Sequence, residues 1–409
     1  MRTRRPIILA LAILLIAATR FCSTPCAQGQ ENREDWNRFL ERESGWLGAD
    51  GIYTVDVRFD AQSGRLDSNA TKKTVWIFSD TIYGETKENG REYRYIHMAN
   101  HSFAALIGDS PDEKNVEFVW RKPSQNGESA PLDAPPKNIV DGRYWLQDGV
   151  RYGDVFWCSA ILVGNGWKPD RVDALEFPID PQTTLPDFSR PQLRTDAPLF
   201  YRADDFQIAL GAALCDDADD GFIYVFGYVD RLREHSRKDA VVARVPRDKF
   251  RDFDAWEFYV GAEKWSRELA DLADPNAALA RNVSTEFSVT RVAGGRFQDK
   301  WALVYTPGCI SNRIAYRLAE KPFGAFQQER VFYRSNVPNE IPGVQCYNAK
   351  AHPALSDDAG LLVSYNVNRL GGIAKRPEEY RPRFVYLTWK DIEKFEDDAK
   401  NNDAKNNRQ

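Results

Sequence analysis

Apolar residues along this chain fall in short runs that are rich in β-branched and aromatic side chains and are separated by Gly, Asn and Ser. Three such runs lie near the N-terminus, at 48–55, 74–81 and 98–106. Runs of this length and composition are typical of antiparallel strands joined by hairpins. If the first two strands pair, Asp50 at the start of one lies at the same end as Asp80 at the finish of the other. The pattern therefore predicts two carboxylates on one rim of a sheet.

This strand pattern recurs five times along the chain. Each repeat contains an aromatic-rich strand whose third residue is, in order, Phe78, Cys158, Phe226, Tyr305 and Tyr365, at steps of 80, 68, 79 and 60 residues. Each of these strands follows another candidate strand, and most of them precede a third. Repetition of strands without regular helices between them is typical of radial arrays. We therefore predict an all-β, five-bladed β-propeller in a single domain, with a two-sheet sandwich as the alternative.

The five predicted blades span approximately residues 46–110, 111–200, 201–265, 282–340 and 341–390. Two proline-rich stretches, 127–140 and 180–198, are interpreted as excursions between strands. Residues 263–280 combine Ala and Leu with spaced acids, which indicates a helix on the rim. The charged, Asn-rich end at 391–409 predicts a disordered polar tail, with disorder beyond about Phe395.

The N-terminus has the pattern of an export signal. Basic residues at 2–5 lead into an apolar run at 7–18, which is too short to span a bilayer comfortably. We predict a signal peptide over 1–27 and therefore a secreted or periplasmic protein with no membrane attachment after cleavage. An uncleaved anchor is the alternative.

Charge and cysteine content narrow the possible partners and cofactors. The chain has a net charge of −5, and its first 27 residues hold four arginines and no acid, so the remainder carries −9. This sign argues against nucleic acid as a partner. No Cys-x-x-Cys pair follows the signal and the chain has only 4 histidines, so we predict no metal site and no cofactor, although an ion in the central channel stays possible. A Cys309–Cys346 disulfide and four free thiols, with Cys158 and Cys215, are left as alternatives.

Five short motifs, in this order, resemble a group of five-bladed propeller families. The motifs lie at 48–53, 78–81, 145–149, 285–289 and 347–350, and the last leads to 363–368. The resemblance covers about residues 46–389 and is to families long described as domains of unknown function, some of which are regarded as endo-D-arabinanases. These are distantly similar to the arabinanase, levansucrase and invertase superfamily. The resemblance implies a glycoside hydrolase acting on a furanose-rich polysaccharide of the arabinan type; Ser79 stands where those families usually have Gly.

Four acids are candidates for catalysis. Glycoside hydrolysis needs one acid to protonate the leaving oxygen and one carboxylate to act as base or nucleophile. The innermost strands of a propeller converge on one axis, and on our alignment three of the five begin near Asp50, Asp148 and Glu286. We predict that Asp50 and Asp80 act as nucleophile or base, that Glu286 is the general acid, and that Asp148 orients or tunes it. Asp before Gly also forms turns, which is the alternative for Asp50 and Asp148.

Neighbouring polar and aromatic residues are candidates for substrate binding. Aromatic faces stack on sugars, although most of the aromatic residues must pack blade against blade. The candidates are His101, Asn100, Tyr53, Trp145 and His352. In either of two functional classes, a hydrolase or a non-catalytic carbohydrate-binding or cell-surface propeller, we expect a polysaccharide or oligosaccharide partner and a monomer.

Overall fold

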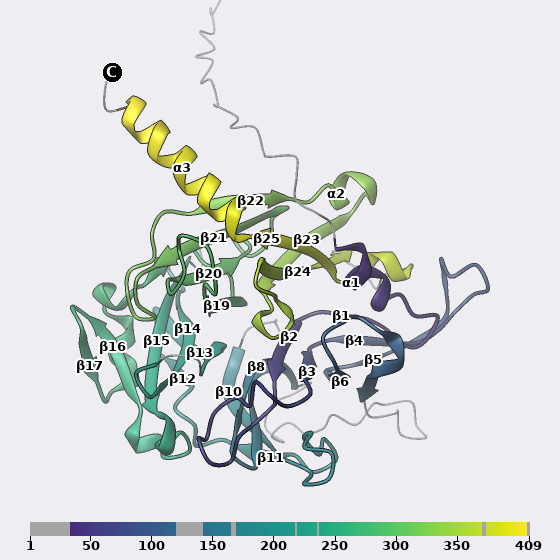
Figure 1. The fold of residues 1–409 in the computed structure, drawn as a ribbon, viewed down its shortest axis with the longest axis horizontal. Helices are drawn as coiled ribbons and strands as arrows, with labels where there is room; N and C mark the ends of the chain where they lie inside the picture. Colours follow the sequence, from purple (N-terminus) through teal and green to yellow (C-terminus); the bar gives the residue numbers. More distant parts are fainter. Residues whose placement is uncertain are drawn as a thin grey trace, which may run out of the picture.

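Five antiparallel sheets follow one another along the chain and surround a central axis (Figure 1). The computed structural model describes residues 33–119, 142–164, 169–216, 219–234, 237–369 and 374–406. The predicted five-bladed β-propeller is confirmed, and each of the five strand positions used to align the repeats lies on the strand that follows the innermost strand of its blade. The predicted signal peptide at 1–27 and most of the proline-rich stretch at 127–140 lie outside the described residues.

The first two blades are four-stranded sheets. Blade 1 consists of β2 (Tyr53–Asp56), β3 (Lys73–Phe78), β6 (Ser102–Ile107) and β7 (Val116–Val119). Blade 2 consists of β8 (Arg143–Tyr152), β9 (Val155–Val163), β10 (Pro169–Pro178) and β11 (Gln192–Arg194).

The other three blades vary in size. Blade 3 comprises β12 (Phe200–Arg202), β13 (Phe206–Cys215), β14 (Phe222–Arg231), β15 (Arg237–Pro246), β16 (Glu257–Gly261) and β17 (Lys264–Ser266), and β18 (Ala280–Arg281) pairs with β15. Blade 4 comprises β19 (Phe287–Arg291), β20 (Trp301–Tyr305), β21 (Arg313–Ala319) and β22 (Arg330–Arg334). Blade 5 comprises β23 (Val344–Ala351), β24 (Gly360–Arg369) and β25 (Arg383–Thr388). The strands β2, β8, β13, β19 and β23 contact one another in that order around the axis.

Three strands of blade 1 bend and continue in a second small sheet. This sheet contains β1 (Ser44–Ala49), β4 (Thr81–Thr86) and β5 (Tyr93–Ala99), and Thr81 pairs with both Ala49 and Ala99. The bends at 50–52, 79–80 and 100–101 therefore lie side by side. Across the first two bends, the Asp50 amide donates to the Asp80 carbonyl oxygen at 3.1 Å, and the Ser79 amide donates to the Asp50 carbonyl oxygen at 2.9 Å. The predicted pairing that places both aspartates on one rim is confirmed.

The ring closes where blade 5 meets blade 1. Helix α1 (Glu34–Phe39) packs against β25, with the rings of Trp36 and Phe384 6.2 Å apart. The hydroxyl of Tyr380 donates to the Asp80 carbonyl oxygen at 3.1 Å, and the Asn366 side chain donates to the Ala49 carbonyl oxygen at 3.3 Å. The N-terminal segment therefore holds the last blade against the first.

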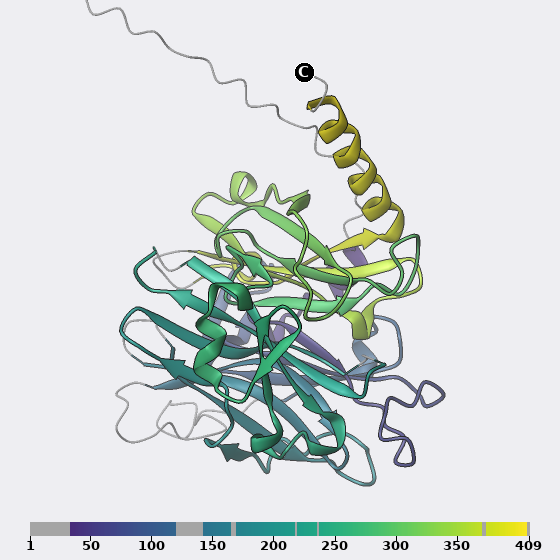
Figure 2. The same ribbon diagram turned by 90° about the vertical axis from the view of Figure 1, so that its left-hand side faces the viewer.

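Two segments differ from their predicted structure. The helix expected at 263–280 is replaced by the short 3₁₀ turns η4 (Leu269–Ala273) and η5 (Pro275–Ala277), because a proline cannot donate the backbone bond that a continuing helix needs. The tail expected to be disordered begins as helix α3 (Trp389–Asn406), which stands out from the propeller (Figure 2). Its first turns pack Ile392 against blades 4 and 5, and the Tyr316 hydroxyl donates to Glu396 at 3.0 Å.

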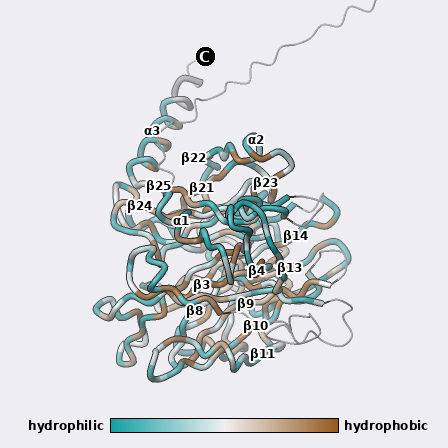
Figure 3. Tube along the Cα trace, turned by 90° about the vertical axis from the view of Figure 1, so that its right-hand side faces the viewer, coloured by the Kyte–Doolittle hydropathy of each residue, from teal (hydrophilic) through white to brown (hydrophobic). Residues whose placement is uncertain are grey.

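Hydrophobic side chains are buried between the blades, and α3 is largely hydrophilic (Figure 3). Among the described residues, no helix is long and apolar enough to cross a membrane. The four cysteines of the described ranges are free thiols, so no disulfide joins Cys309 to Cys346.

Trp36 should be essential for stability because its side chain is 2% exposed and lies against Trp76 and Phe384 at the seam between the first and last blades. We expect Trp36→Ala to lower the free energy of unfolding by about 3–5 kcal/mol, as for other large-to-small core substitutions. Urea denaturation measures the change. Leu66→Ala, at a side chain that is 51% exposed, is the control and should leave stability nearly unchanged; equal effects of both substitutions would contradict the role of this contact.

Candidate active site

Asp50 and Asp80 lie at adjacent bends of blade 1, and each receives a hydrogen bond from a neighbouring blade. The Tyr347 hydroxyl of β23 donates to Asp50 Oδ2 at 2.7 Å, and Trp145 Nε1 of β8 donates to Asp80 Oδ1 at 3.0 Å. Both aspartates are half-buried. Residues from blades 1, 2 and 5 therefore fix the two carboxyls.

Glu286 precedes β19 and binds two donors from β23. Asn348 Nδ2 donates to Glu286 Oε1 at 2.7 Å, and Lys350 Nζ donates to Oε2 at 2.6 Å. The Lys350 side chain is 1% exposed, and its ammonium lies 4.2 Å from the centre of the Tyr53 ring. A buried lysine requires such a partner, because an unpaired ammonium is costly to remove from water.

A β-bulge in β23 directs its side chains toward two different acids. The pairing with β24 shifts between Tyr347, opposite Asn366, and Lys350, opposite Ser364, so one extra residue lies on β23. Asn348 has a φ of +53°, a left-handed conformation that Asn tolerates better than most residues. Without this bulge, a regular strand would alternate its side chains and could not present Tyr347, Asn348 and Lys350 in these positions.

The two aspartates have unequal proton affinities. Burial raises the pKa of Asp50 to about 8, and the negative charges of Asp80 and Glu286 raise it as well, against the lowering effect of the hydrogen bond from Tyr347. Burial also raises the pKa of Asp80, to about 6, but the Trp145 hydrogen bond and the Arg143 charge lower it. Near neutral pH the pair therefore holds one proton, mainly on Asp50.

Asp148 connects blades 2 and 3. Its Oδ1 accepts the Gly149 amide at 2.9 Å, and its Oδ2 accepts the Leu214 amide at 2.8 Å. Burial raises the pKa of Asp148 to about 7, while these hydrogen bonds and the Lys350 charge lower it. Lys350 thus acts electrostatically on Asp148 while it pairs with Glu286, and the predicted tuning role of Asp148 stays a prediction.

The predicted substrate-binding residues fall into two groups. Trp145 and Asn100 are half-buried and belong to the rim, where Trp145 contacts Asp80. Tyr53, His101 and His352 are buried, with at most 3% of each residue exposed. For His352 the cause is clear: its ring nitrogens lie 3.1 Å from Thr54 Oγ1 and 2.7 Å from Ser364 Oγ, and burial lowers its pKa to about 3. It joins blade 5 to blade 1 and has no ring surface to offer a ligand.

His101 is likewise enclosed. Its Nδ1 lies 3.4 Å from the Tyr144 carbonyl oxygen of β8, and its ring contacts Phe103. It contributes to the contact between blades 1 and 2 at the bend formed by 100–101.

Four residues that contact the acids were not among the predicted site residues. Tyr347, Asn348 and Lys350 belong to the motif at 347–350, which carried the resemblance, so their spacing was a signal that could have been used. Tyr380 follows the 3₁₀ turn η7 (Pro377–Glu379) in a loop of blade 5, and its sequence gives no sign that its hydroxyl reaches Asp80.

A sequence profile of the family described as "Domain of unknown function (DUF5005)" matches residues 33–389. The chain belongs to the DUF5005 family. Among proteins with curated descriptions, none matches this DUF5005 chain.

A solved structure with a TM-score above 0.5 shares the fold of this DUF5005 protein, and others match it at lower scores. A "putative hydrolase" from Bacteroides ovatus ATCC 8483 has a TM-score of 0.67 and 17% identity, covering 90% of this chain and 94% of that chain. The GH43_1 enzyme from Xanthomonas citri, complexed with xylotriose, has a TM-score of 0.39 and 13% identity over 86% of this chain and 93% of its own. An alpha-L-arabinanase mutant from Cellvibrio cellulosa has a TM-score of 0.43 and 10% identity over 83% and 92%.

The raised pKa of Asp50 predicts a pH-dependent effect of its charge on stability. A carboxyl with a raised folded-state pKa favours folding in its neutral form, so its contribution is full below about pH 4 and is lost as pH rises through about 8. We expect Asp50→Asn to raise Tm by about 2 °C or more at pH 9 and to leave it unchanged at pH 4. Calorimetry at both pH values tests this, and a loss of Tm at pH 9 would contradict it.

Proposed function

We propose that this protein is a secreted glycoside hydrolase that cleaves a furanose-rich polysaccharide of the arabinan type. The observation that carries the proposal is the pair of half-buried carboxyls, Asp50 and Asp80, whose pKa values are raised unequally on one rim. Two neighbouring carboxyls whose pKa values differ in this way can act as acid and base at the same pH. The arabinan type of substrate follows from the motif resemblance, and secretion follows from the pattern at 1–27.

In the proposed mechanism, Asp50 is the general acid and Asp80 is the base or nucleophile. Asp50 is the better proton carrier, because burial and two nearby negative charges favour its neutral form. Asp80 stays ionised near neutral pH, and the hydrogen bond from Trp145 stabilises its charge. The proton on Asp50 would pass to the leaving glycosidic oxygen, while Asp80 either attacks the anomeric carbon or activates water.

This mechanism changes the roles predicted for Asp50 and Glu286: Asp50, predicted as nucleophile or base, becomes the general acid in place of Glu286. A general acid must carry a proton on one carboxyl oxygen and direct it at the substrate, but both oxygens of Glu286 accept bonds from Asn348 and Lys350. Its negative charge instead helps to keep Asp50 protonated. We therefore assign Glu286 an electrostatic role.

Asparagine substitutions test the two catalytic aspartates. On a panel of arabinans and other plant, algal and bacterial glycans, we expect Asp50→Asn and Asp80→Asn each to lower the rate by about 10²–10⁴-fold. Asp204→Asn, at an exposed aspartate of blade 3, is the matched control and should keep full activity. Rates within a few-fold of wild type for both active-site variants would refute the assignment. If the wild-type protein hydrolyses no glycan of the panel but binds one of them, the non-catalytic binding module would be favoured.

The pH profile separates the roles of Asp50 and Glu286. Activity requires ionised Asp80 and protonated Asp50, so the rate should fall below about pH 6 and above about pH 8. Glu286→Gln removes a charge that raises the pKa of Asp50, and we expect the alkaline limb to move to lower pH while the maximal rate falls less than 10-fold. A loss of about 10²-fold or more at every pH would instead identify Glu286 as the general acid.

A further inference from the structure

A cavity of about 500 Å³ lies in the central channel, away from Asp50, Asp80 and Glu286. All five blades line it, through 53–56, 148–151, 214–216, 288–290, and Ala351 with 353–354. These residues lie within the innermost strands or just after them, whereas Asp50 and Glu286 precede β2 and β19. The cavity, which we call the rear cavity, therefore occupies the opposite end of the channel, and its volume falls within the usual range for small-molecule sites.

Tyr53 and Asp148 stand between the two ends of the channel. Both line the rear cavity, and the ring of Tyr53 lies under the Lys350 ammonium that pairs with Glu286. A ligand in the rear cavity would therefore contact residues beside the acids without occupying their rim.

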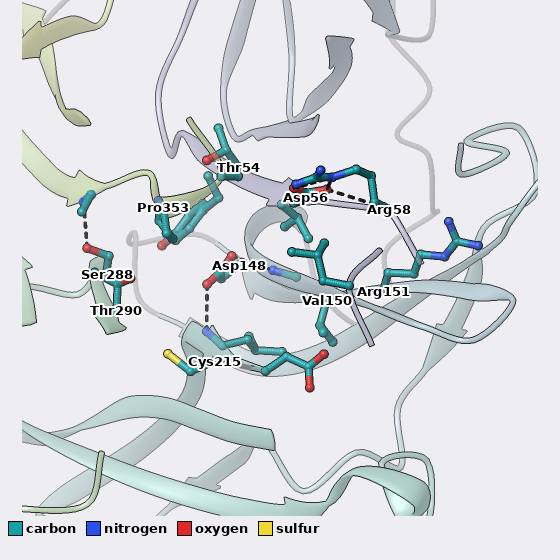
Figure 4. A pocket seen from close by; sticks show the side chains of 18 of the residues that line it. Thr54, Asp56, Arg58, Asp148, Val150, Arg151, Cys215, Ser288, Thr290 and Pro353 are labelled. Carbon is teal, nitrogen blue, oxygen red and sulfur yellow. Dashed lines mark hydrogen bonds and ion pairs between the residues drawn. The ribbon is translucent and has the colours of Figure 1, made fainter. Parts of the chain in front are cut away.

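The polar groups of the rear cavity are arranged around Asp148 (Figure 4). Its carboxyl accepts two amides, which leaves further acceptor capacity on each oxygen. Ser288 Oγ accepts the Ala351 amide at 2.7 Å, so its own hydroxyl hydrogen can be donated elsewhere. Thr290 supplies a second hydroxyl, and Val55, Val150 and Pro353 supply apolar wall.

The charges in the lining restrict the chemistry of a ligand. Of the three lining aspartates, Asp56 and Asp216 are paired with Arg58 and Arg247, and within the described ranges no ion pair involves Asp148. The cations Arg65, Lys72 and Arg151 also line the cavity; Lys72 pairs with Asp109, and Arg151 donates to the carbonyl oxygens of Val57, Gly153 and Thr184. An anion bound directly against Asp148 would be repelled by its carboxylate. A metal ion would need a set of carboxylate, imidazole or thiolate ligands, and the described residues contain no group of three or more that could hold one. The lining therefore suits a neutral ligand with several hydroxyl groups and an apolar face. Its hydroxyls would hydrogen-bond to Asp148, Ser288 and Thr290, and its C–H groups would pack on the valines.

We propose that the rear cavity is a second, non-catalytic site for a neutral monosaccharide. Asp148 accepts two of the sugar's hydroxyl hydrogens, Ser288 and Thr290 hydrogen-bond to further hydroxyls, and the sugar's apolar face packs on Val55 and Val150. The site shares Asp148 with the candidate catalytic acids, but none of its contacts uses Asp50 or Asp80, the pair that carries the proposed hydrolase activity.

Calorimetric titration with monosaccharides tests the rear cavity directly. The ligands are arabinose in both enantiomers, xylose, galactose and glucose, with glucuronate as the anionic comparison. We expect at least one neutral sugar to bind wild type with a Kd in the millimolar range or tighter, and glucuronate to bind at least 10-fold more weakly. Ala354→Trp, which fills the cavity from the 3₁₀ turn η6 (Pro353–Leu355), should weaken binding by at least 10-fold.

Asp80→Asn is the control that separates the two ends of the channel, and it should bind the sugar as wild type does. If Ala354→Trp does not fold, Thr290→Val keeps the side-chain shape while removing one hydroxyl, and it should weaken binding several-fold. The proposal is overturned if no sugar binds, if both cavity variants bind normally, or if Asp80→Asn abolishes binding. If the wild-type protein binds a sugar in this cavity but shows no hydrolase activity, only the catalytic proposal is refuted.

Discussion

Closure of the ring is the constraint on which the rest of this structure depends. The last blade has to meet the first, and the chain makes that seam from a few hydrogen bonds that join residues about 300 positions apart. Tyr347 reaches Asp50, Tyr380 reaches the main chain of Asp80, and His352 reaches Thr54. Two of these bonds end on the residues of the candidate catalytic pair, so the contacts that close the propeller also position the acids.

The row of bends in blade 1 explains why carboxyls occur at this seam. Where three strands leave one sheet for another, the ladder of backbone hydrogen bonds is interrupted and the side chains no longer alternate regularly. Short polar residues suit such bends, and Asp50, Asp80 and Asn100 occupy them. The surrounding blades withdraw the carboxyls from water, and for both aspartates this effect outweighs the hydrogen bonds that favour the charged form.

Local pattern was enough to predict the strands and the pairing of Asp50 with Asp80, because both depend on hairpin register within one blade. The surroundings of Glu286 could not be predicted in this way, since Asn348 and Lys350 reach it across a blade boundary through a bulge that leaves little trace in sequence. The end of the chain was misjudged because its average polarity hides one apolar stripe, formed by Trp389, Ile392 and Phe395. Likewise, His352 was predicted as a substrate-binding residue, although Thr54 and Ser364 enclose it within the core.

The type of hydrogen-bond donor, more than the identity of the acid, distinguishes the carboxyls of this site. Glu286 faces the ammonium of Lys350, whose positive charge compensates its own. Asp50 faces the hydroxyl of Tyr347, a neutral donor whose hydrogen bond offsets only part of the rise in pKa that burial causes. The negative charges of Asp80 and Glu286 raise the pKa of Asp50 as well. Since both donors come from β23, separated by two residues and a bulge, one strand of the last blade determines which acid can hold a proton. The same strand contributes Ala351 to the wall of the rear cavity, so the two ends of the channel share one structural support.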